Sequence, residues 1–149
     1  MRSGRRPLPR GERGTMLVLM AFYSALALLL ILIVTAATSL YLERKRLFSL
    51  ADGAALVGAE AFDLADVRID GGTVSVHLDP GDVRDAVDDY VAIAPTGAFE
   101  GLQVVKATSE DGRSATVQLS AVWRPPVVAL FLPEGVRLDV TAIARSVFQ

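Results

Sequence analysis

The sequence predicts an α+β fold in which a long N-terminal helix packs against a small antiparallel sheet of about five strands, with one short helix besides. Three observations lead to this prediction. A run of 29 residues without charge, 14–42, is followed by an Ala-rich helical pattern, and no proline interrupts residues 15–67. Beyond that pattern, short segments of alternating apolar and polar residues are separated by turns that contain Gly or Pro.

Charge divides the 149-residue chain into two parts of opposite sign. Residues 1–46 hold eight Lys and Arg against two Glu, whereas residues 47–149 hold seven Lys and Arg against fifteen Asp and Glu. Because an acidic domain repels the phosphate backbone, we expect no binding to nucleic acid. The chain has no cysteine, which excludes disulfides, thiolate zinc sites and thiol nucleophiles, and which is consistent with an oxidising exterior.

The apolar run is long enough to cross a membrane. A helix needs about 20 apolar residues to span the hydrocarbon core, and residues 17–34 are almost entirely apolar. A cleaved secretory signal has a shorter apolar region, of about 7–15 residues. We therefore predict a retained transmembrane helix over residues 14–42, with cleavage near the small residues 36–39 as the alternative.

Basic residues flank this run on both sides. Five Arg precede it within residues 1–13, and Arg44, Lys45 and Arg46 follow it. An excess of Lys and Arg marks the cytoplasmic side, so we predict a single-pass protein of the cell membrane with a cytoplasmic N-terminus and an extracytoplasmic C-terminal domain. Residues 1–13 are then a basic cytoplasmic tail, which sets the topology and contacts anionic lipid.

The helical pattern continues past the basic residues to about residue 66. Small and apolar residues such as Ala51, Ala54 and Gly58 recur at three- and four-residue steps on one face. We expect residues 43–66 to continue the helix outside the membrane, which would make it about 75 Å long. Two interpretations of the small-residue face stay open: it lets the domain's own sheet approach closely, or it lets neighbouring copies of the helix pack together.

Residues 67–149 are predicted to form the extracytoplasmic α+β domain. Period-2 alternation marks the strands, and Gly and Pro mark the breaks between them. The expected elements are strands 67–70 and 73–78 around a Gly71-Gly72 turn, a helix from Asp82 to about residue 94, strands 102–109 and 114–123 around a turn at 110–112, a helical turn at 127–133 and a last strand at 136–148.

The sequence offers little for catalysis, and we expect no enzyme. His77 is the only histidine, and strand alternation places it opposite the apolar face of its strand, as a surface residue rather than a general base or ligand. There is no G-x-S-x-G stretch, no phosphate-binding glycine loop and no dinucleotide fingerprint. We therefore assign no catalytic residue, no cofactor and no cofactor-binding residue.

Five aspartates crowd residues 79–89. Calcium takes several oxygen ligands, but the spacing of these residues does not match a calcium-binding loop. Asp82 is better explained as the N-cap or first-turn residue of the short helix, and the other aspartates as a solvated face. We assign no metal site.

Two apolar features of the domain are candidate contacts. Trp123, which precedes Arg124 and two prolines, is suited to anchor a partner. A Trp at the end of a strand is more often part of the core, and we predict that role. For residues 127–132, an exposed contact loop and an ordinary apolar segment both stay open.

The N-terminal third of the chain resembles a known family. The features that carry the resemblance are Glu12-Arg13-Gly14, the apolar span, the short basic segment and the pattern L-A-D-x-A-A-L-x-x-A at residues 50–59. Together they resemble the N-terminal segment of TadE/TadG-like proteins of the tight-adherence (Tad/Flp) pilus-assembly systems. Residues 141–146, TAIARS, are similar to the closing strand of that family.

This resemblance implies a pilin-like fold and a bitopic protein of a bacterial envelope. Proteins of this class act as minor pilins, or as assembly and anchoring factors for a surface filament or an associated secretion apparatus. Prepilins that a dedicated peptidase cleaves carry a Glu five residues after the cleavage glycine, whereas Leu19 stands at that distance from Gly14. We therefore expect no cleavage after Gly14 and a chain that stays in the membrane, as TadG-like members do.

The leading hypothesis is a membrane-anchored, pilin-like component of Tad/Flp pilus assembly or associated secretion that acts by protein–protein contacts. Its expected partners are the lipid bilayer and other Tad/Flp pilin-like subunits or assembly-platform proteins, with further copies of itself as an option. The alternative is a membrane-anchored extracytoplasmic sensor or ligand-binding module of the bacterial envelope. A deep polar pocket would favour the alternative, and a flat or apolar contact face would favour the leading hypothesis.

Overall fold

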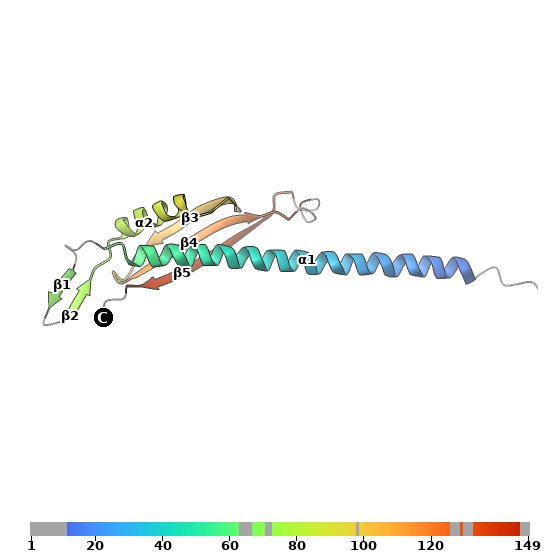
Figure 1. Cartoon of the computed structure of the whole chain (residues 1–149), viewed down its shortest axis with the longest axis horizontal. Coiled ribbons are helices and arrows are strands. Elements are labelled where there is room, and N and C mark those ends of the chain that lie inside the picture. The colour runs from blue at the N-terminus through green and yellow to red at the C-terminus, as the bar shows by residue number, and fades with distance from the viewer. Residues whose placement is uncertain are drawn as a thin grey trace, which may run out of the picture. The chain divides into compact units, whose positions relative to one another are not determined.

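The computed structural model describes residues 12–62, 67–70, 73–97, 99–125, 129 and 133–146. The chain divides into two compact units, Met1–Ala37 and Thr38–Gln149. The first unit holds the apolar part of helix α1 (Glu12–Ala59). The second unit holds the rest of α1 and every other helix and strand (Figure 1).

Helix α1 ends at Ala59, earlier than the predicted end near residue 66. In its last turn the amide of Glu60 donates to the carbonyls of Leu56 and Val57, and the amide of Ala61 donates to the carbonyl of Gly58. Hydrogen bonds to the third residue back, as in a 3₁₀ turn, are typical of helix ends. They give a partner to carbonyls that have none further along the helix. Phe62 then packs against the core, so the helix ends although the Ala-rich pattern continues.

Helix α2 (Pro80–Ile93) begins with a capped first turn. The carboxylate of Asp79 accepts a hydrogen bond of 2.7 Å from the amide of Gly81, and Pro80 suits the first helical position because its missing N–H would have no partner there. Asp82 lies in the first turn. The predicted short helix is therefore confirmed, with Asp79 rather than Asp82 as its N-cap.

The five strands form two separate sheets. Strands β3 (Glu100–Thr108), β4 (Ser114–Trp123) and β5 (Val136–Arg145) form an antiparallel sheet in the order β3-β4-β5. Strands β1 (Val67–Asp70) and β2 (Thr73–Val76) pair only with each other within the described residues. The prediction of one sheet of about five strands is therefore wrong, and the sheet has three. Alternation identifies a strand and its faces but does not encode which edges pair.

Two predicted features fall outside this description. The Gly71-Gly72 turn lies outside the described residues, and so does most of the helical turn expected at residues 127–133. Within that second segment, the amide of Ala129 donates to the carbonyl of Pro125 at 2.9 Å.

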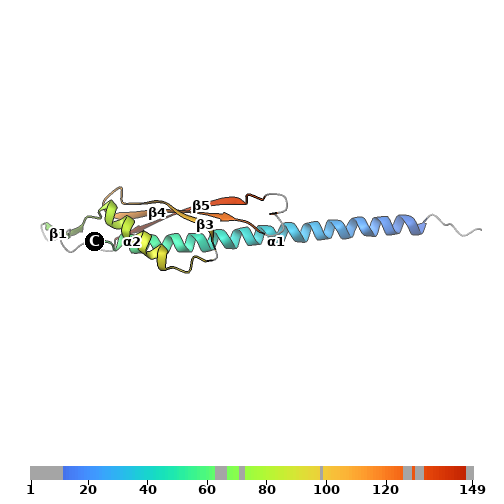
Figure 2. The ribbon, with the colours of Figure 1, turned by 90° about the horizontal axis from the view of Figure 1, so that it is seen from above.

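The core of the second unit lies between the C-terminal part of α1, helix α2 and one face of the three-stranded sheet. Figures 1 and 2 show the strands running beside this part of α1. Odd-numbered residues of β4 and even-numbered residues of β5 face inward, as the alternation predicts. The buried residues of these elements are Leu47, Ala51, Ala54, Ala55 and Ala59 of α1, Val83 and Val87 of α2, Ala107 of β3, Ala115, Val117, Leu119 and Ala121 of β4, and Val140, Ala142 and Ala144 of β5.

Candidate functional site: the surfaces of helix α1

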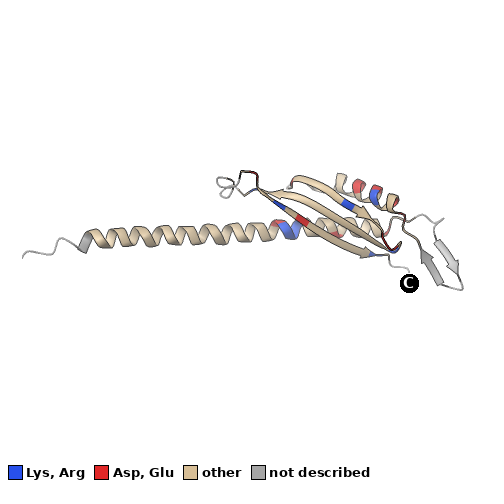
Figure 3. Ribbon diagram, turned by 180° about the vertical axis from the view of Figure 1, so that it is seen from behind, with Lys and Arg blue, Asp and Glu red and all other residues tan. Residues whose placement is uncertain are grey.

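The first candidate surface is the apolar half of α1, which we define as residues 14–42. It carries no charge, and in Figure 3 this part of the ribbon is tan up to a band of red acidic and blue basic residues. Its large apolar side chains from Met16 to Val34 are exposed, with exposed fractions between 43% and 75%. Among the described residues, this helix alone is long and apolar enough to cross a membrane; its most apolar window has a mean hydropathy of 2.9 and no buried residue.

A helix of this composition in a water-soluble fold would be buried, since unburied apolar surface of this extent is costly in water. Within the described residues of the first unit, every large apolar side chain from Met16 to Val34 is exposed. The apolar half is therefore suited to single-pass membrane anchoring.

The small-residue face of α1 packs against the sheet and helix α2 of its own domain. Ala51 and Ala54 are fully buried. A Cβ atom added at Gly58 would lie 3.2 Å from side-chain carbons of Ala115 and Val83 and 3.3 Å from Val87. Of the two interpretations left open by the sequence, the close approach of the domain's own sheet is thus confirmed for this face, and α2 takes part in the same contact.

The opposite face of the same part of α1 carries an apolar stripe, which we call the outer stripe: Tyr41, Phe48 and Leu56. Their exposed fractions are 65%, 49% and 53%. A step of seven residues returns to within about 20° of the same side of a helix, whereas a step of eight ends about 80° away. The three side chains therefore lie within about 80° of one another, on a face that also carries the exposed Lys45 and Asp52. The fold does not need this apolar surface, which makes it a candidate contact. The sequence does not mark this face by a regular repeat, whereas small residues at three- and four-residue steps mark the other face.

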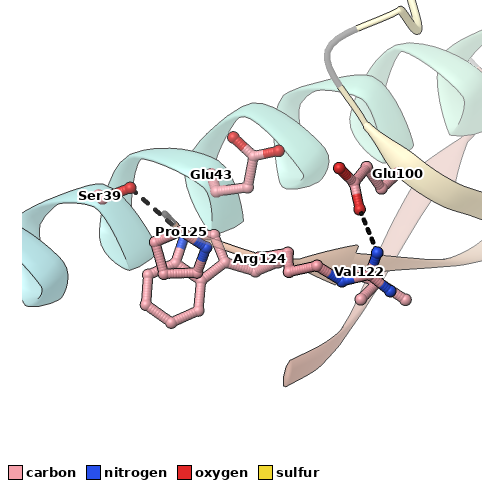
Figure 4. A pocket seen from close by; sticks show the side chains of 7 residues that line it. Ser39, Glu43, Glu100, Val122, Arg124 and Pro125 are labelled. Carbon is pink, nitrogen blue, oxygen red and sulfur yellow. Dashed lines mark hydrogen bonds and ion pairs between the residues drawn. The ribbon is translucent and has the colours of Figure 1, made fainter. Parts of the chain in front are cut away.

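At the end of β4 the sheet is tied to α1 in what we call the α1–β4 corner (Figure 4). Trp123 is 8% exposed, and its indole N–H donates to Oγ of Ser39 at 3.3 Å. The predicted core role of Trp123 is confirmed, although it lies outside the main cluster of buried residues. Beside it, the guanidinium of Arg124 lies 3.2 Å from a carboxylate oxygen of Glu100.

A small recess opens at this corner. It has a volume of about 210 Å³. The residues that line it are Ser39, Glu43, Glu100, Val122, Trp123, Arg124 and Pro125. Pockets for small-molecule ligands usually measure roughly 300–1,000 Å³ and enclose most of the ligand. This recess is below that range, so it does not offer the deep polar pocket that the sensor alternative calls for.

A basic band adjoins the corner along α1. Arg44, Lys45 and Arg46 are exposed, whereas Glu43 is half-buried at the recess. The guanidinium of Arg46 lies 3.9 Å from the carboxylate of Glu43. Two cations of the band, Arg44 and Lys45, form no ion pair within the described part of the chain, so they are available to an external anion.

His77 and the aspartates of residues 79–89, which the sequence offers as candidate catalytic or metal-binding residues, lie on the surface or cap helix α2. His77 is exposed, as predicted, and its ring lies against Gly112. Asp79 caps α2, and Asp88 forms an ion pair of 3.5 Å with Arg84. Across the ranges that the structure describes, no three His, Asp or Glu side chains are grouped as metal ligands would be.

Residues 14–61 match the Tad family, whose description is "Putative Flp pilus-assembly TadE/G-like". The resemblance of the N-terminal third is therefore confirmed, whereas the predicted similarity of residues 141–146 lies outside the match. We call residues 14–61 the Tad segment; it covers about a third of the chain. The search of curated proteins and the search of solved structures each found no match.

The Tad segment coincides with α1 almost residue for residue. It includes the apolar half, the buried small-residue face and the outer stripe. A match to a pilus-assembly family supports a pilus-assembly role, and the surfaces of α1 are where that role has to be sought.

Proposed function

We propose that the protein is a membrane-anchored, pilin-like component of Tad/Flp pilus assembly or of an associated secretion apparatus, and that it acts by protein–protein contacts rather than by catalysis. The observation that carries the proposal is the coincidence of the Tad segment with a helix that has two different halves. One half is apolar and unburied, and the other half packs into the core of the second unit.

Anchoring follows from the length and flanks of the apolar half. About 20 residues suffice to cross the hydrocarbon core, and the uncharged run of 29 residues exceeds that length. Five Arg on the N-terminal side against three basic residues on the other favour a cytoplasmic N-terminus. The sheet and α2 are then extracytoplasmic, and residues 1–13 form a cytoplasmic tail.

The outer stripe is the proposed contact surface for another pilin-like subunit or an assembly-platform protein. Tyr41, Phe48 and Leu56 lie on the same helix as the membrane span, so a partner with its own membrane helix meets them side by side. Full burial of a large apolar side chain contributes about 1.5–3 kcal/mol, which makes the stripe a modest contact by itself. Confinement in one membrane raises the effective concentration of the partners, so a modest contact suffices.

Piliation of a deletion strain tests the proposal. Loss of the gene is expected to abolish surface pili or Tad-dependent secretion, and the wild-type gene is expected to restore them. A double variant of the stripe, Phe48→Glu with Leu56→Glu, is expected to reach the membrane at normal abundance and to leave the strain without pili. Val105→Glu is the matched control, because Val105 is also 49% exposed but lies on β3.

Two results would count against the proposal at different levels. Normal pili and secretion in the deletion strain would contradict the assembly role itself. Normal pili with the stripe variant, at wild-type abundance, would contradict the outer stripe as the contact surface and leave the assembly role in place.

A further inference from the structure

We infer that the α1–β4 corner rests on the lipid headgroups of the membrane that α1 spans, with Trp123 at headgroup depth. The inference depends on the membrane anchoring proposed above. It goes beyond that proposal because it gives the sheet a lipid contact of its own and fixes the depth of one end of the sheet.

The height of the corner follows from helix geometry. If residues 17–36 fill the hydrocarbon core, Ser39 lies three residues further on, about 4.5 Å at 1.5 Å per residue. The polar headgroup layer adds about 5–7 Å on each side of the core. The hydrogen bond of 3.3 Å between Trp123 and Ser39 holds the end of β4 at this level. The compact unit that contains the sheet begins at Thr38, one residue before that contact.

The side chains at this level have the chemistry of a membrane interface. Trp and Tyr are enriched where the bilayer meets water, because one end of each ring is apolar and the other is polar. Tyr41, two residues beyond Ser39, is 65% exposed, whereas Trp123 is 8% exposed and marks the depth of the corner from inside the fold.

Cations follow this level along α1: Arg44, Lys45 and Arg46 begin five residues beyond Ser39, about 7.5 Å further from the core, from where their long side chains can reach back to the headgroups. Consecutive helical residues point about 100° apart, so Arg44, Lys45 and Arg46 spread around the helix, and Arg124 adds a fourth cation from the sheet. Clusters of Lys and Arg beside a membrane span attract anionic headgroups. Glu43 and Glu100 offset part of this charge through their pairs with Arg46 and Arg124.

Trp123 is the only tryptophan of the chain, so its fluorescence tests the inference in the full-length protein. The chain is placed in nanodiscs of anionic phospholipid whose acyl chains are unbrominated, brominated near the headgroup or brominated near the bilayer centre. Bromine quenches tryptophan only at short range. Emission is expected to fall about twofold with shallow bromine and clearly less with deep bromine, as for a residue at the interface.

A variant with its single tryptophan at another position serves as the control for quenching. In Trp123→Phe with Glu110→Trp, the indole moves to the exposed turn at the far end of the sheet, and neither brominated lipid is expected to quench it. Incorporated wild-type protein whose Trp123 emission is unaffected by shallow bromine would overturn the inference and leave the anchoring intact. A chain that does not incorporate into nanodiscs at all would overturn both.

Discussion

Gly58 lies where α1 meets both α2 and β4, and its missing side chain sets the distance between these elements. The nearest side-chain carbons lie 3.2–3.3 Å from the position of a Cβ, closer than ordinary van der Waals contact, and they belong to Ala115, Val83 and Val87. Gly53 lies under Tyr90 of α2 in a similar way, with the hydroxyl oxygen 2.5 Å from a Cβ position. The small residues of α1 are therefore required by the packing of its own domain.

The substitution Gly58→Leu is expected to destabilise the second unit by about 1–3 kcal/mol, because a packed core cannot accept the added volume without strain. Thermal unfolding of the full chain in detergent measures the change. Gly97→Leu is the control, since no atom lies within 4 Å of its Cβ position. Equal stability of the two variants would show that the close packing around Gly58 does not limit stability.

Asp111 organises the turn from β3 to β4. Its carboxylate accepts hydrogen bonds from the amides of Arg113 and Ser114, at 2.9 and 2.6 Å, and from the hydroxyl of Ser114 at 2.9 Å. These donors stabilise the charged form and lower the pKa of Asp111 from 3.8 to about 2. Because the folded pKa is the lower one, the stabilisation is present above pH 3.8 and is lost as the pH falls toward 2.

Asp111→Asn is therefore expected to lower the Tm by a constant amount above about pH 4 and by less as the pH approaches 2. Melting curves of both proteins between pH 2 and 6 measure the difference. A difference in Tm that does not change across this range would show that the hydrogen bonds to Asp111 do not distinguish its charged form.

At the scale of the elements, β4 is the central strand, and its two faces have different roles. Leu119 is fully buried against the helices, whereas Thr116 and Gln118 belong to the other face, where no helix of the described structure is packed. On the same outer face, Ile143 of β5 is 66% exposed. The loss of stability caused by a substitution in the sheet is therefore expected to depend on the face on which the residue lies, and not on how apolar the residue is.

Leu119→Ala is expected to lower the free energy of unfolding by about 2–5 kcal/mol, the usual cost of a cavity in a core. Ile143→Ala is expected to change it by less than about 0.5 kcal/mol, as exposed substitutions do. Chemical unfolding followed by circular dichroism compares them. Similar losses for both variants would mean that the outer face of the sheet is covered in the protein.

Most elements could be predicted from local patterns, whereas their partners could not. The apolar run with its Ala-rich continuation indicated α1, the aspartate-proline start indicated α2, and alternation indicated β3, β4 and β5. The separation of β1 and β2 from the other strands depends on edge pairing, which alternation does not encode. The contact between Trp123 and Ser39 joins residues 84 positions apart, so no local pattern reveals it. The outer stripe has no regular apolar spacing in the sequence, and it becomes evident only because its side chains stay exposed in the structure.

At the scale of the whole molecule, the proposal requires that the two ends of the chain lie on different sides of the membrane. The absence of cysteine makes this directly testable with single-cysteine variants. Glu110→Cys, in the exposed turn, is expected to react with a membrane-impermeant maleimide in intact cells. Ser3→Cys, in the basic tail, is expected to react only after permeabilisation. The reverse pattern would show that the domain is cytoplasmic, contrary to the charge-based prediction.

In the proposed role, α1 both anchors the protein and presents a contact surface to other Tad components. A photoreactive amino acid at position 48, in cells that assemble pili, provides the test of this claim. We predict a cross-linked product that contains a second pilin-like or assembly-platform protein, and no such product from the same group at position 105. The absence of a product from position 48, or equal products from both positions, would contradict the claim.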